Sequence, residues 1–389
     1  MYDAGHIHPN GKAKRAVSHG QRRDYAAETW AALIPTIMLQ NAPMSHPLAT
    51  LPATDPVHIL RLRDRQYGAE LIAAALLHFD FFSWLGQNDG VTDADVCRQF
   101  EFAARPADVL LTLCRANGFV TTDAAGGHHL TQLGREHLVK GSPWYLGPYY
   151  APIKDTPIVQ GFLKVLRTGK PANWQAKSDA KDWHESMLDE DFARSFTDLM
   201  NSRGMIFGQY LAKAVTPLLG DRRHLLDVGG GSGIYSSTMV AAHPQLSATV
   251  LEQPPVDAIV SKEVAKHGLT DRVQVASGDM FQIAWPEADI VLLSNVLHDW
   301  DLPEMRALLT KAANTLPSGG LLIIHDAFIR DDKTGPHPVA EYSALLMNIT
   351  QGKCYSPAEY GAVLTELGFA VGPFQDTVAD RGFMSAVKR

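Results

Sequence analysis

Several side chains that could take part in catalysis or ligand binding lie at or just after the ends of successive apolar runs. They are Asp227, Glu252, Asp279, His298 and Asp326. A neutral histidine can take a proton from a hydroxyl, and a carboxylate on its other ring nitrogen fixes the tautomer and stabilises the imidazolium that forms. We therefore expect His298 to act as a general base and Asp326 to orient it. The alternative for a single histidine at the end of a strand is a structural role.

A glycine-rich segment, residues 227–233 with the sequence DVGGGSG, follows the first of these runs. Glycines let a strand-to-helix turn bend sharply and approach a ligand closely. The segment does not match the dinucleotide fingerprint GxGxxG, because Ile234 stands where the last glycine is required. Asp227 suits a cationic or amino-bearing ligand such as S-adenosylmethionine, which carries a sulfonium and an α-amino group. The alternative for the segment by itself is a tight turn without a ligand.

The next polar residues extend the same set. Glu252 ends the second predicted strand, where a carboxylate can accept hydrogen bonds from both hydroxyls of a ribose. Asp279 can accept from an adenine amino group, while Met280 packs on the ring face. Each also has an ordinary alternative: a solvated loop position for Glu252, a turn cap for Asp279 and core packing for Met280. Because open α/β sheets bind ligands at the carboxyl ends of their strands, the joint pattern predicts a binding site there.

The elements that must position these groups begin at His224, where apolar β-rich runs alternate with helical ones. Alternation of this kind predicts an α/β fold with a mainly parallel sheet covered on both faces. The expected strands are 224–229, 248–252, 273–278, 289–295, 321–325, 371–378 and 382–388, and the expected helices lie near 235–243, 255–267, 303–316 and 357–367. The connection between the last two strands is too short for a crossover, so they are expected to be antiparallel. A seven-stranded Rossmann-like sheet with one reversed strand is typical of class I methyltransferases.

The preceding residues divide into three expected parts. Residues 1–56 form an extension with a possible helix from Tyr25 to Met38. Residues 57–141 combine short helices, an apolar helix from Tyr67 to Leu85 among them, with a small hairpin, which is the pattern of a winged-helix module. Residues 142–215 form an aromatic-rich helical linker that contributes to an acceptor pocket, and residues 216–389 form the catalytic domain.

A winged helix suggests either DNA binding or a dimerisation and lid domain. Its candidate recognition helix, Pro106 to Ala116, offers only Arg105 and Arg115 as basic groups. The formal net charge of the chain is −7, which disfavours a polyanionic partner. We therefore expect dimerisation and no nucleic-acid partner.

Composition sets further limits, since 46% hydrophobic and 20% charged residues are typical of a globular protein. The cysteines Cys97, Cys114 and Cys354 lie far apart, which argues against a disulfide framework and favours a reducing, cytoplasmic location. The histidine spacing fits no zinc motif, so no metal is expected. No apolar run is long enough to span a membrane. The basic first 25 residues lack the apolar core of a secretory signal, and a transit peptide is the remaining alternative.

Three runs, Leu226 to Gly233, Gly278 to Phe281 and Leu297 to Asp301, resemble in order and spacing the caffeate-type small-molecule O-methyltransferases of plants and their bacterial antibiotic-tailoring relatives. The resemblance covers about residues 57–389 and implies an intertwined homodimer formed through the winged-helix portion. It also implies S-adenosylmethionine as cofactor, and His298 matches the general base of that family. The implied cofactor-binding residues are Asp227, Gly229, Gly231, Gly233, Glu252, Asp279 and Met280, to which we add Ser294 at the end of the fourth strand.

The chain departs from the family at two positions near this histidine. Asp326 stands where the family has a glutamate, and Cys354, after Gly352 and Lys353, stands where many relatives have a second carboxylate. For the acceptor pocket we expect aromatic and methionine side chains, together with an amide that hydrogen-bonds a ring substituent. These residues are Phe192, Phe196, Met200, Trp183, Met347 and Asn348, and core packing is the alternative for those on one helical face.

Three functional hypotheses follow from these observations. The first is methyl transfer from S-adenosylmethionine to a hydroxyl of a small, aromatic molecule in secondary metabolism. The second is transfer to carbon, nitrogen or sulfur on the same scaffold, which the cysteine at position 354 favours. The third is a non-catalytic cofactor-sensing or DNA-binding protein, which salt-dependent binding to duplex DNA would support.

Overall fold

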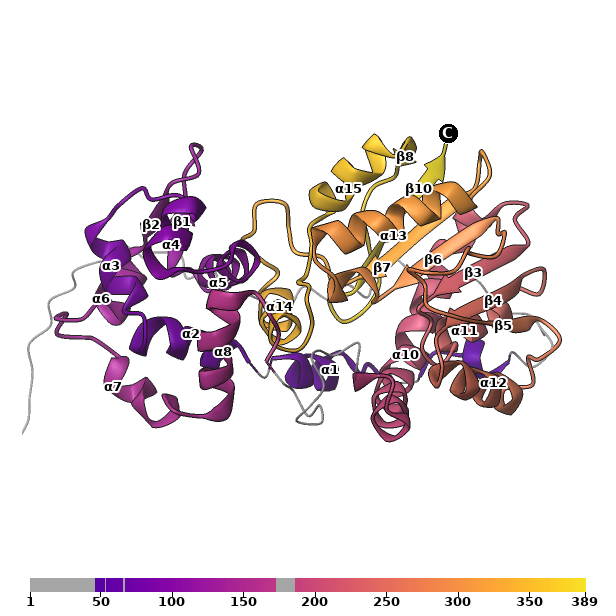
Figure 1. Cartoon of the computed structure of the whole chain (residues 1–389), viewed down its shortest axis with the longest axis horizontal. Helices are drawn as coiled ribbons and strands as arrows, with labels where there is room; N and C mark the ends of the chain where they lie inside the picture. Colours follow the sequence, from indigo (N-terminus) through magenta and orange to yellow (C-terminus); the bar gives the residue numbers. More distant parts are fainter. Residues whose placement is uncertain (1–45, 53, 66, 173–185) are drawn as a thin grey trace, which may run out of the picture. The chain divides into compact units, whose positions relative to one another are not determined.

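The central feature of the computed structural model is a twisted, mostly parallel sheet (Figure 1). The structure describes residues 46–52, 54–65, 67–172 and 186–389. Its strands are β3 (His224–Val228), β4 (Ser247–Glu252), β5 (Val273–Ser277), β6 (Ile290–Ser294), β7 (Leu321–Asp326), β8 (Phe369–Val371), β9 (Gln375–Asp376) and β10 (Gly382–Lys388). The spatial order is β5-β4-β3-β6-β7-β10-β8, and β9 pairs with β10. Strands β3 to β7 are parallel, whereas β10 runs antiparallel to its neighbours, so the predicted fold class is confirmed.

One strand prediction was wrong in detail. The expected strand 371–378 is divided into β8 and β9, which gives the sheet eight strands instead of seven. Pro373 lies in the interruption, and proline has no N–H to donate to a strand ladder.

The apolar side chains of the sheet alternate between two cores, one on each face. On β7, Leu322 and Ile324 pack into one core, while Leu321 and Ile323 pack into the other. Helices α13 (Leu302–Thr315) and α15 (Pro357–Glu366) cover the first face. Helices α10 (Glu190–Leu219), α11 (Ile234–Ala242) and α12 (Val256–Lys266) cover the second. This double coverage explains why these strands read as continuous apolar runs.

The N-terminal part is helical and includes a short hairpin. Its elements are η1 (Pro47–Ala49), α1 (Val57–Asp64), α2 (Gly68–Leu77), α3 (Phe81–Gln87), α4 (Asp93–Phe100), α5 (Ala104–Ala116), β1 (Val120–Thr122), β2 (His128–Leu130), α6 (Gln132–Leu138), α7 (Gly147–Tyr150), η2 (Ala151–Ile153) and α8 (Pro157–Thr168). The predicted hairpin is present, since β1 and β2 pair antiparallel. Helix α14 (His337–Ile349), from the C-terminal part, packs into the core of these helices.

The expected single helix from Tyr67 to Leu85 is two helices, α2 and α3. The chain turns at Asp80, whose φ of 50° is left-handed and incompatible with continuing a right-handed helix. Among the described residues no single helix has the length and apolarity to cross a bilayer, although α2 with His78 and α3 together, bent by 63°, reach that length and composition.

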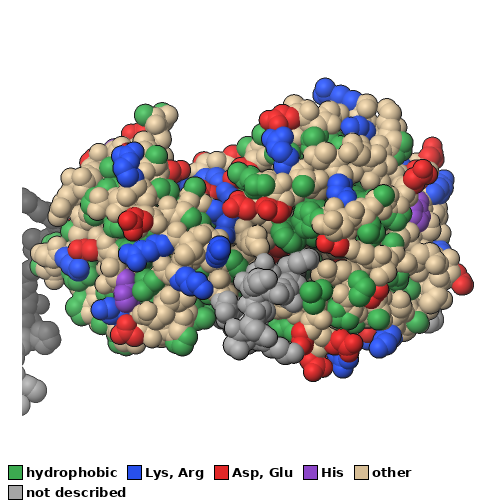
Figure 2. All heavy atoms as spheres, viewed as in Figure 1, with side chains coloured by type: hydrophobic (Ala, Val, Ile, Leu, Met, Phe, Trp, Pro, Cys, Tyr) green, Lys and Arg blue, Asp and Glu red, His purple; other side chains and the backbone are tan. Residues whose placement is uncertain are grey.

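Helix α5 is the candidate recognition helix of the winged-helix pattern, and its basic side chains are used internally. Arg105 is buried and donates to the carbonyls of Gly352 and Gly169. Arg115 lies 3.9 Å from Asp108 and donates to the hydroxyl of Thr112. On the face shown in Figure 2, basic and acidic side chains are interspersed. These observations give the DNA-binding alternative no support, and the absence of a nucleic-acid partner stays a prediction.

Residues 45–389 form one compact unit. The expected boundary at residue 215 falls inside α10, which continues to Leu219. The boundaries at 56, 141 and 215 therefore stay predictions. The expected helix from Tyr25 to Met38 and the side chain of Trp183 lie outside the described residues.

Candidate active site

The glycine-rich turn between β3 and α11 forms one wall of a cavity of about 320 Å³. Gly229 and Gly231 line it with φ values of 65° and 60°, which L side chains rarely adopt. A Cβ built on Gly231 would meet no atom within 4 Å, so a side chain there would fill space that the turn leaves open. Gly230 lines the cavity as well, and sequence reasoning did not assign it a role.

Two predicted cofactor residues do not line the cavity. Gly233 begins α11, and a Cβ there would lie 3.0 Å from Cγ1 of Val260, so this glycine permits close packing of the helix. Asp227 is fully buried beneath the turn, where its Oδ2 accepts a hydrogen bond from Ser236 Oγ at 2.8 Å. Burial raises the pKa of Asp227 to about 6. Both residues thus support the turn from behind, and their direct contact with a cofactor stays a prediction.

The remaining predicted cofactor residues, Glu252, Asp279, Met280 and Ser294, all line the cavity. Glu252 accepts hydrogen bonds from the backbone N–H groups of Gly231 and Gln253 at 2.9 and 3.0 Å. Burial raises the pKa of its carboxyl to about 7. Asp279 accepts from the N–H of Phe281 at 2.8 Å, which fits the turn-cap alternative but leaves its second oxygen available.

His298 and Asp326 come together because β6 and β7 are adjacent parallel strands that end at the same edge. His298 lies in the turn η3 (Leu297–Asp299) after β6, and its Nδ1 donates to Oδ1 of Asp326. The same oxygen accepts from the N–H of Ala327 at 2.7 Å. Both side chains are almost fully buried, and His298 lines the cavity. The shorter aspartate therefore reaches the histidine in this chain.

Asp299 is a functional candidate that sequence reasoning missed. It lines the cavity, and its Oδ1 lies 3.5 Å from Nε2 of His298, the ring nitrogen that does not face Asp326. Burial raises the pKa of Asp299 to about 6. Cys354 is buried and outside the lining, and burial raises the pKa of its thiol well above the ordinary value. The only sequence signal for Asp299 was its place beside the histidine.

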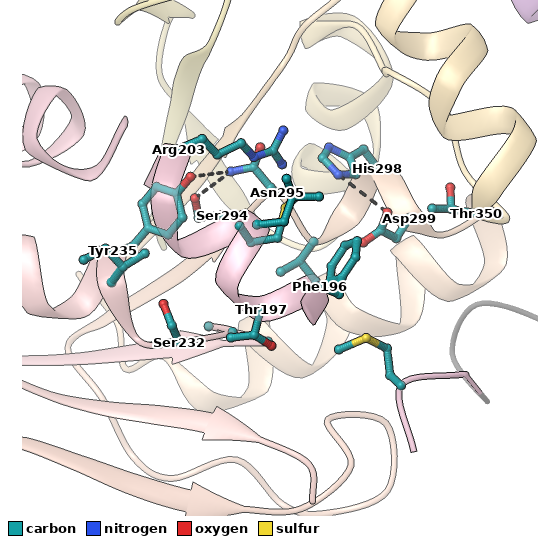
Figure 3. Close-up of a pocket in the computed structure, with 18 of the residues that line it drawn as sticks. Phe196, Thr197, Arg203, Ser232, Tyr235, Ser294, Asn295, His298, Asp299 and Thr350 are labelled. Atoms are coloured by element: carbon teal, nitrogen blue, oxygen red, sulfur yellow. Dashed lines mark hydrogen bonds and ion pairs between the residues drawn. The ribbon is translucent and has the colours of Figure 1, made fainter. Parts of the chain in front are cut away.

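A polar network continues from the histidine toward α11 (Figure 3). Asn295 donates to the hydroxyl of Tyr235 at 3.0 Å and to Oγ of Ser294 at 3.2 Å. Ser294 Oγ and Nδ1 of His325 lie 2.8 Å apart. Burial lowers the pKa of His325 to about 3, so this histidine stays neutral at physiological pH. Asn295 and Tyr235 line the cavity, and the sequence analysis gave them no role.

The apolar wall of the cavity comes from α10 and α14. Phe196 and Met200 on α10 line it as expected, whereas Phe192 stacks against Phe196 outside the lining. Met347 and Asn348 lie outside the lining, because α14 turns them toward the N-terminal helices, and their role in acceptor binding stays a prediction. Met347 is in their core, and the backbone carbonyl of Asn348 accepts from Ala172 N–H. The residues of this segment that do line the cavity are Tyr342, Leu345, Leu346, Ile349 and Thr350.

Helix α1 and one arginine of α10 also contribute to the lining. Ile59, Leu60, Arg63 and Asp64 come from α1, and Arg203 comes from α10. No pattern in the sequence pointed to these residues, because α1 lies far from the glycine-rich turn along the chain. Among the described residues there is no group of three or more His, Cys, Asp or Glu side chains that could hold a metal.

The sheet order, the reversed strand, the glycine-rich turn and the carboxylate that ends β4 together define the class I methyltransferase fold. Residues 163–370 match the model of a protein family described as the O-methyltransferase domain. A 3-hydroxy-5-methyl-1-naphthoate 3-O-methyltransferase of Streptomyces sahachiroi is 32% identical over 284 residues, which are 72% of this chain and 80% of that protein. An L-tyrosine C(3)-methyltransferase of Streptomyces lavendulae is 29% identical over 77% of this chain and 83% of that protein.

Among solved structures, an O-methyltransferase family 2 protein from Planctomyces limnophilus in complex with apigenin has a TM-score of 0.78 and 29% sequence identity. The similarity covers 88% of this chain and 98% of that chain. This chain belongs to the O-methyltransferase domain family. It is an S-adenosylmethionine-dependent O-methyltransferase.

Proposed function

We propose that this enzyme methylates a hydroxyl of a small aromatic molecule, with His298 as the general base. The observation that carries the proposal is that His298, hydrogen-bonded to the buried Asp326 behind it, lines the same cavity as the glycine-rich turn. A carboxylate on Nδ1 holds the proton there and leaves the lone pair of Nε2 free to accept one. A phenol with a pKa near 10 is mostly protonated at neutral pH, so removal of its proton as the oxygen attacks accelerates the reaction.

Asp299 would assist on the other side of the ring. Its carboxyl, with a pKa of about 6, is mostly ionised at neutral pH and lies 3.5 Å from Nε2. When Nε2 takes the acceptor's proton, this charge stabilises the imidazolium. We propose that Asp299 supplies the second carboxylate that the cysteine at position 354 does not.

The residues that would hold the cofactor line the same cavity as the apolar wall. Gly229 and Gly231 would allow close backbone approach, Glu252 would accept from ribose hydroxyls, and Asp279 with Met280 would contact adenine. When bound, S-adenosylmethionine supplies an electrophilic methyl group on its sulfonium. The open space over Gly231, together with the Glu252 carboxylate at the end of β4, supports this fit.

An aromatic acceptor is supported by the apolar wall. Phe196, Met200, Leu345 and Ile349 line the cavity and offer flat, apolar surface. A naphthoate and apigenin, named with the relative and with the similar structure, are flat aromatic molecules that carry hydroxyls.

The test is product analysis with an acceptor panel of naphthols, hydroxynaphthoates, aromatic amines and tyrosine. We expect methyl ethers and stoichiometric release of S-adenosylhomocysteine from the phenolic acceptors. The second candidate, carbon methylation, is favoured by the similarity to the L-tyrosine C(3)-methyltransferase. Methyl groups found only on carbon or nitrogen would replace the first proposal with the second.

We also propose that the N-terminal helices serve a homodimer, as a winged-helix dimerisation domain. Support comes from exposed apolar side chains at and before α7, directly after the winged-helix portion, since Trp144, Leu146 and Tyr149 expose 59%, 44% and 81% of their surface. Light scattering at micromolar concentration should give twice the 42.5 kDa mass of the chain. A monomer at every concentration would contradict this. The cytoplasmic location and the lack of membrane partners remain predictions.

A further inference from the structure

Arg203 brings a positive charge into the cavity, and this charge has no part in the proposed proton transfer to His298. It extends from α10 and lines the cavity between Tyr235 and His298 (Figure 3). Its Nη1 donates to the hydroxyl of Tyr342 at 3.2 Å. The guanidinium also lies 5.8 Å from the ring centre of Tyr342 and 5.9 Å from that of Phe207. Most of its N–H donors thus have no hydrogen-bond acceptor among the described residues.

Three arginines with almost fully buried side chains, Arg105, Arg115 and Arg381, differ from Arg203 in one respect. Each has a carboxylate partner: Arg105 lies 3.4 Å from Asp301, Arg115 lies 3.9 Å from Asp108 and Arg381 lies 3.0 Å from Asp64. A guanidinium removed from water without an anion is costly, which is why enclosed arginines are normally paired. Within the described part of the chain, no carboxylate lies within ion-pair distance of Arg203.

The carboxylates that share the cavity have other partners. Asp64 pairs with Arg381, and Asp299 faces His298. Glu252 accepts from two backbone N–H groups and Asp279 from one. None of them therefore neutralises Arg203. Their negative charges also disfavour a multiply charged ligand such as a phosphate ester, whereas a single carboxylate matches the planar fork of an arginine.

We propose that Arg203 is the carboxylate-binding residue of this cavity, paired with an anionic group of a bound ligand. Two ligands of this enzyme class offer that chemistry: the methionine carboxylate of the cofactor and a carboxylate attached to an aromatic acceptor. Recognition of an acceptor carboxylate rests on the proposed function, whereas recognition of the cofactor does not. The carboxylate would replace water on the free N–H donors while Tyr342 keeps its hydrogen bond.

The experiment compares Arg203→Met with Arg203→Lys, which keeps the charge but not the fork. Arg194→Met is the matched control, because Arg194 is exposed on the same helix and does not line the cavity. Thermal unfolding first establishes that each variant is folded. If Arg203→Met does not fold, the same binding measurements are made with Arg203→Lys. Binding of S-adenosylhomocysteine is then measured by calorimetry beside 5′-methylthioadenosine, which lacks the amino-acid portion.

If the cofactor is the source of the carboxylate, Arg203→Met weakens S-adenosylhomocysteine binding by about 10- to 100-fold and leaves methylthioadenosine binding unchanged. In the second arm, a hydroxynaphthoate and the naphthol without the carboxylate are titrated into the S-adenosylhomocysteine complex. If the acceptor is the source, only the hydroxynaphthoate loses affinity, by a similar factor. In either case Arg203→Lys shows a smaller loss, and Arg194→Met shows none.

Unchanged affinities for all four ligands in Arg203→Met would overturn the proposal and make Arg203 a packing residue on Tyr342 and Phe207. Equal losses for ligands with and without a carboxylate would overturn it too, because they indicate a general disturbance of the cavity. Failure of the proposed function has a different signature. In that case the wild-type enzyme binds S-adenosylhomocysteine but forms no methyl ether from either naphthol derivative.

Discussion

Glu252 titrates near neutral pH because burial raises the pKa of its carboxyl to about 7. Asp227 and Asp257 are the neighbouring charges that add to this shift. Hydrogen bonds from ribose hydroxyls stabilise the ionised form, so a bound ligand should lower this pKa. Binding then releases a proton, and affinity rises with pH until the carboxyl of the free enzyme is ionised.

We therefore expect the affinity for S-adenosylhomocysteine to rise, by up to about tenfold per pH unit, between pH 5.5 and 7 and to level off above. Calorimetry across this range measures it. Glu252→Gln cannot ionise, so its affinity should be weaker and nearly independent of pH. A flat profile in the wild-type protein would remove Glu252 from the ribose site.

At the scale of single residues, position along a strand decides which of the predicted site residues lie close together at the edge of the sheet. Glu252, His298 and Asp326 end strands or follow them, and the parallel sheet brings these ends together. Asp227 precedes the end of its strand by one residue and lies beneath the turn. Arg203 lies in the middle of a long amphipathic helix, where the sequence gives no sign of which arginine faces a cavity.

At the scale of elements, the segment after α14 holds the catalytic turn by direct backbone contact. A Cβ on Gly352 would lie 2.0 Å from the carbonyl oxygen of His298 and 2.7 Å from the N–H nitrogen of Trp300. The N–H of Gln351 donates to the backbone carbonyl of Asp299. The hydroxyl of Tyr355 donates to the backbone carbonyl of Trp300. A displacement of this segment must therefore move the turn that carries His298.

Gly352→Ala should lower kcat by about 100-fold, since a shift of about 1 Å in a catalytic group costs that much. Binding of S-adenosylhomocysteine should change little, because the glycine-rich turn is a separate wall of the cavity. Gly361→Ala is the matched control, as a Cβ there meets no atom within 4 Å. Steady-state kinetics with calorimetry measure both, and a kcat like that of the wild type in Gly352→Ala would show that the segment does not position His298.

The sequence does not assign the two faces of α14. The methionine and amide residues of α14 predict that this helix forms part of the pocket wall. Other residues of α14 do line the cavity. Its apolar residues extend around most of its circumference, because it packs on the N-terminal helices as well as on the cavity. A helix buried all round has no amphipathic signal that assigns faces, so the sequence does not indicate that Met347 and Asn348 face away from the cavity.

At the scale of the whole chain, an ion-pair cluster joins the N-terminal helices to the C-terminal part. Lys353 contacts Asp108 of α5 and Glu359 of α15, and Lys333 contacts the same two carboxylates. The lysines lower the pKa of both carboxyls despite burial. The cluster follows directly after Gly352, so it anchors the segment that holds the catalytic turn.

Lys353→Met should lower the free energy of unfolding by up to about 3–5 kcal/mol, because it leaves buried carboxylates with one cation fewer. A lowered carboxyl pKa stabilises the folded state above the pKa of the unfolded chain, and this is lost as pH falls below about 4. The penalty should therefore be larger at pH 7 than at pH 3. Chemical denaturation at both pH values measures it, with Lys262→Met, an exposed change on α12, as the control. Equal penalties at both values would contradict the ionic account.

The sequence predicts the parallel sheet of the catalytic domain, but it does not predict which N-terminal helices contact the active-site segments. Alternating apolar runs predict a parallel sheet because strand and helix periods are local properties. Contacts between α1, α5 and the active-site segments depend on residues separated by more than 200 positions, such as Arg105 and Gly352. No local pattern encodes such pairs, so neither the α1 wall nor the Lys353 cluster was expected.

The central claim is that His298, held by Asp326, removes the proton of a hydroxyl while the glycine-rich turn and Glu252 hold the cofactor. The most direct test is the turnover of His298→Ala on a phenolic acceptor at saturating S-adenosylmethionine, together with its affinity for S-adenosylhomocysteine. We expect turnover to fall by about 10²–10⁴-fold while that affinity stays within about twofold of the wild-type value. A fall of less than about tenfold would contradict the claim and indicate an acceptor that needs no base.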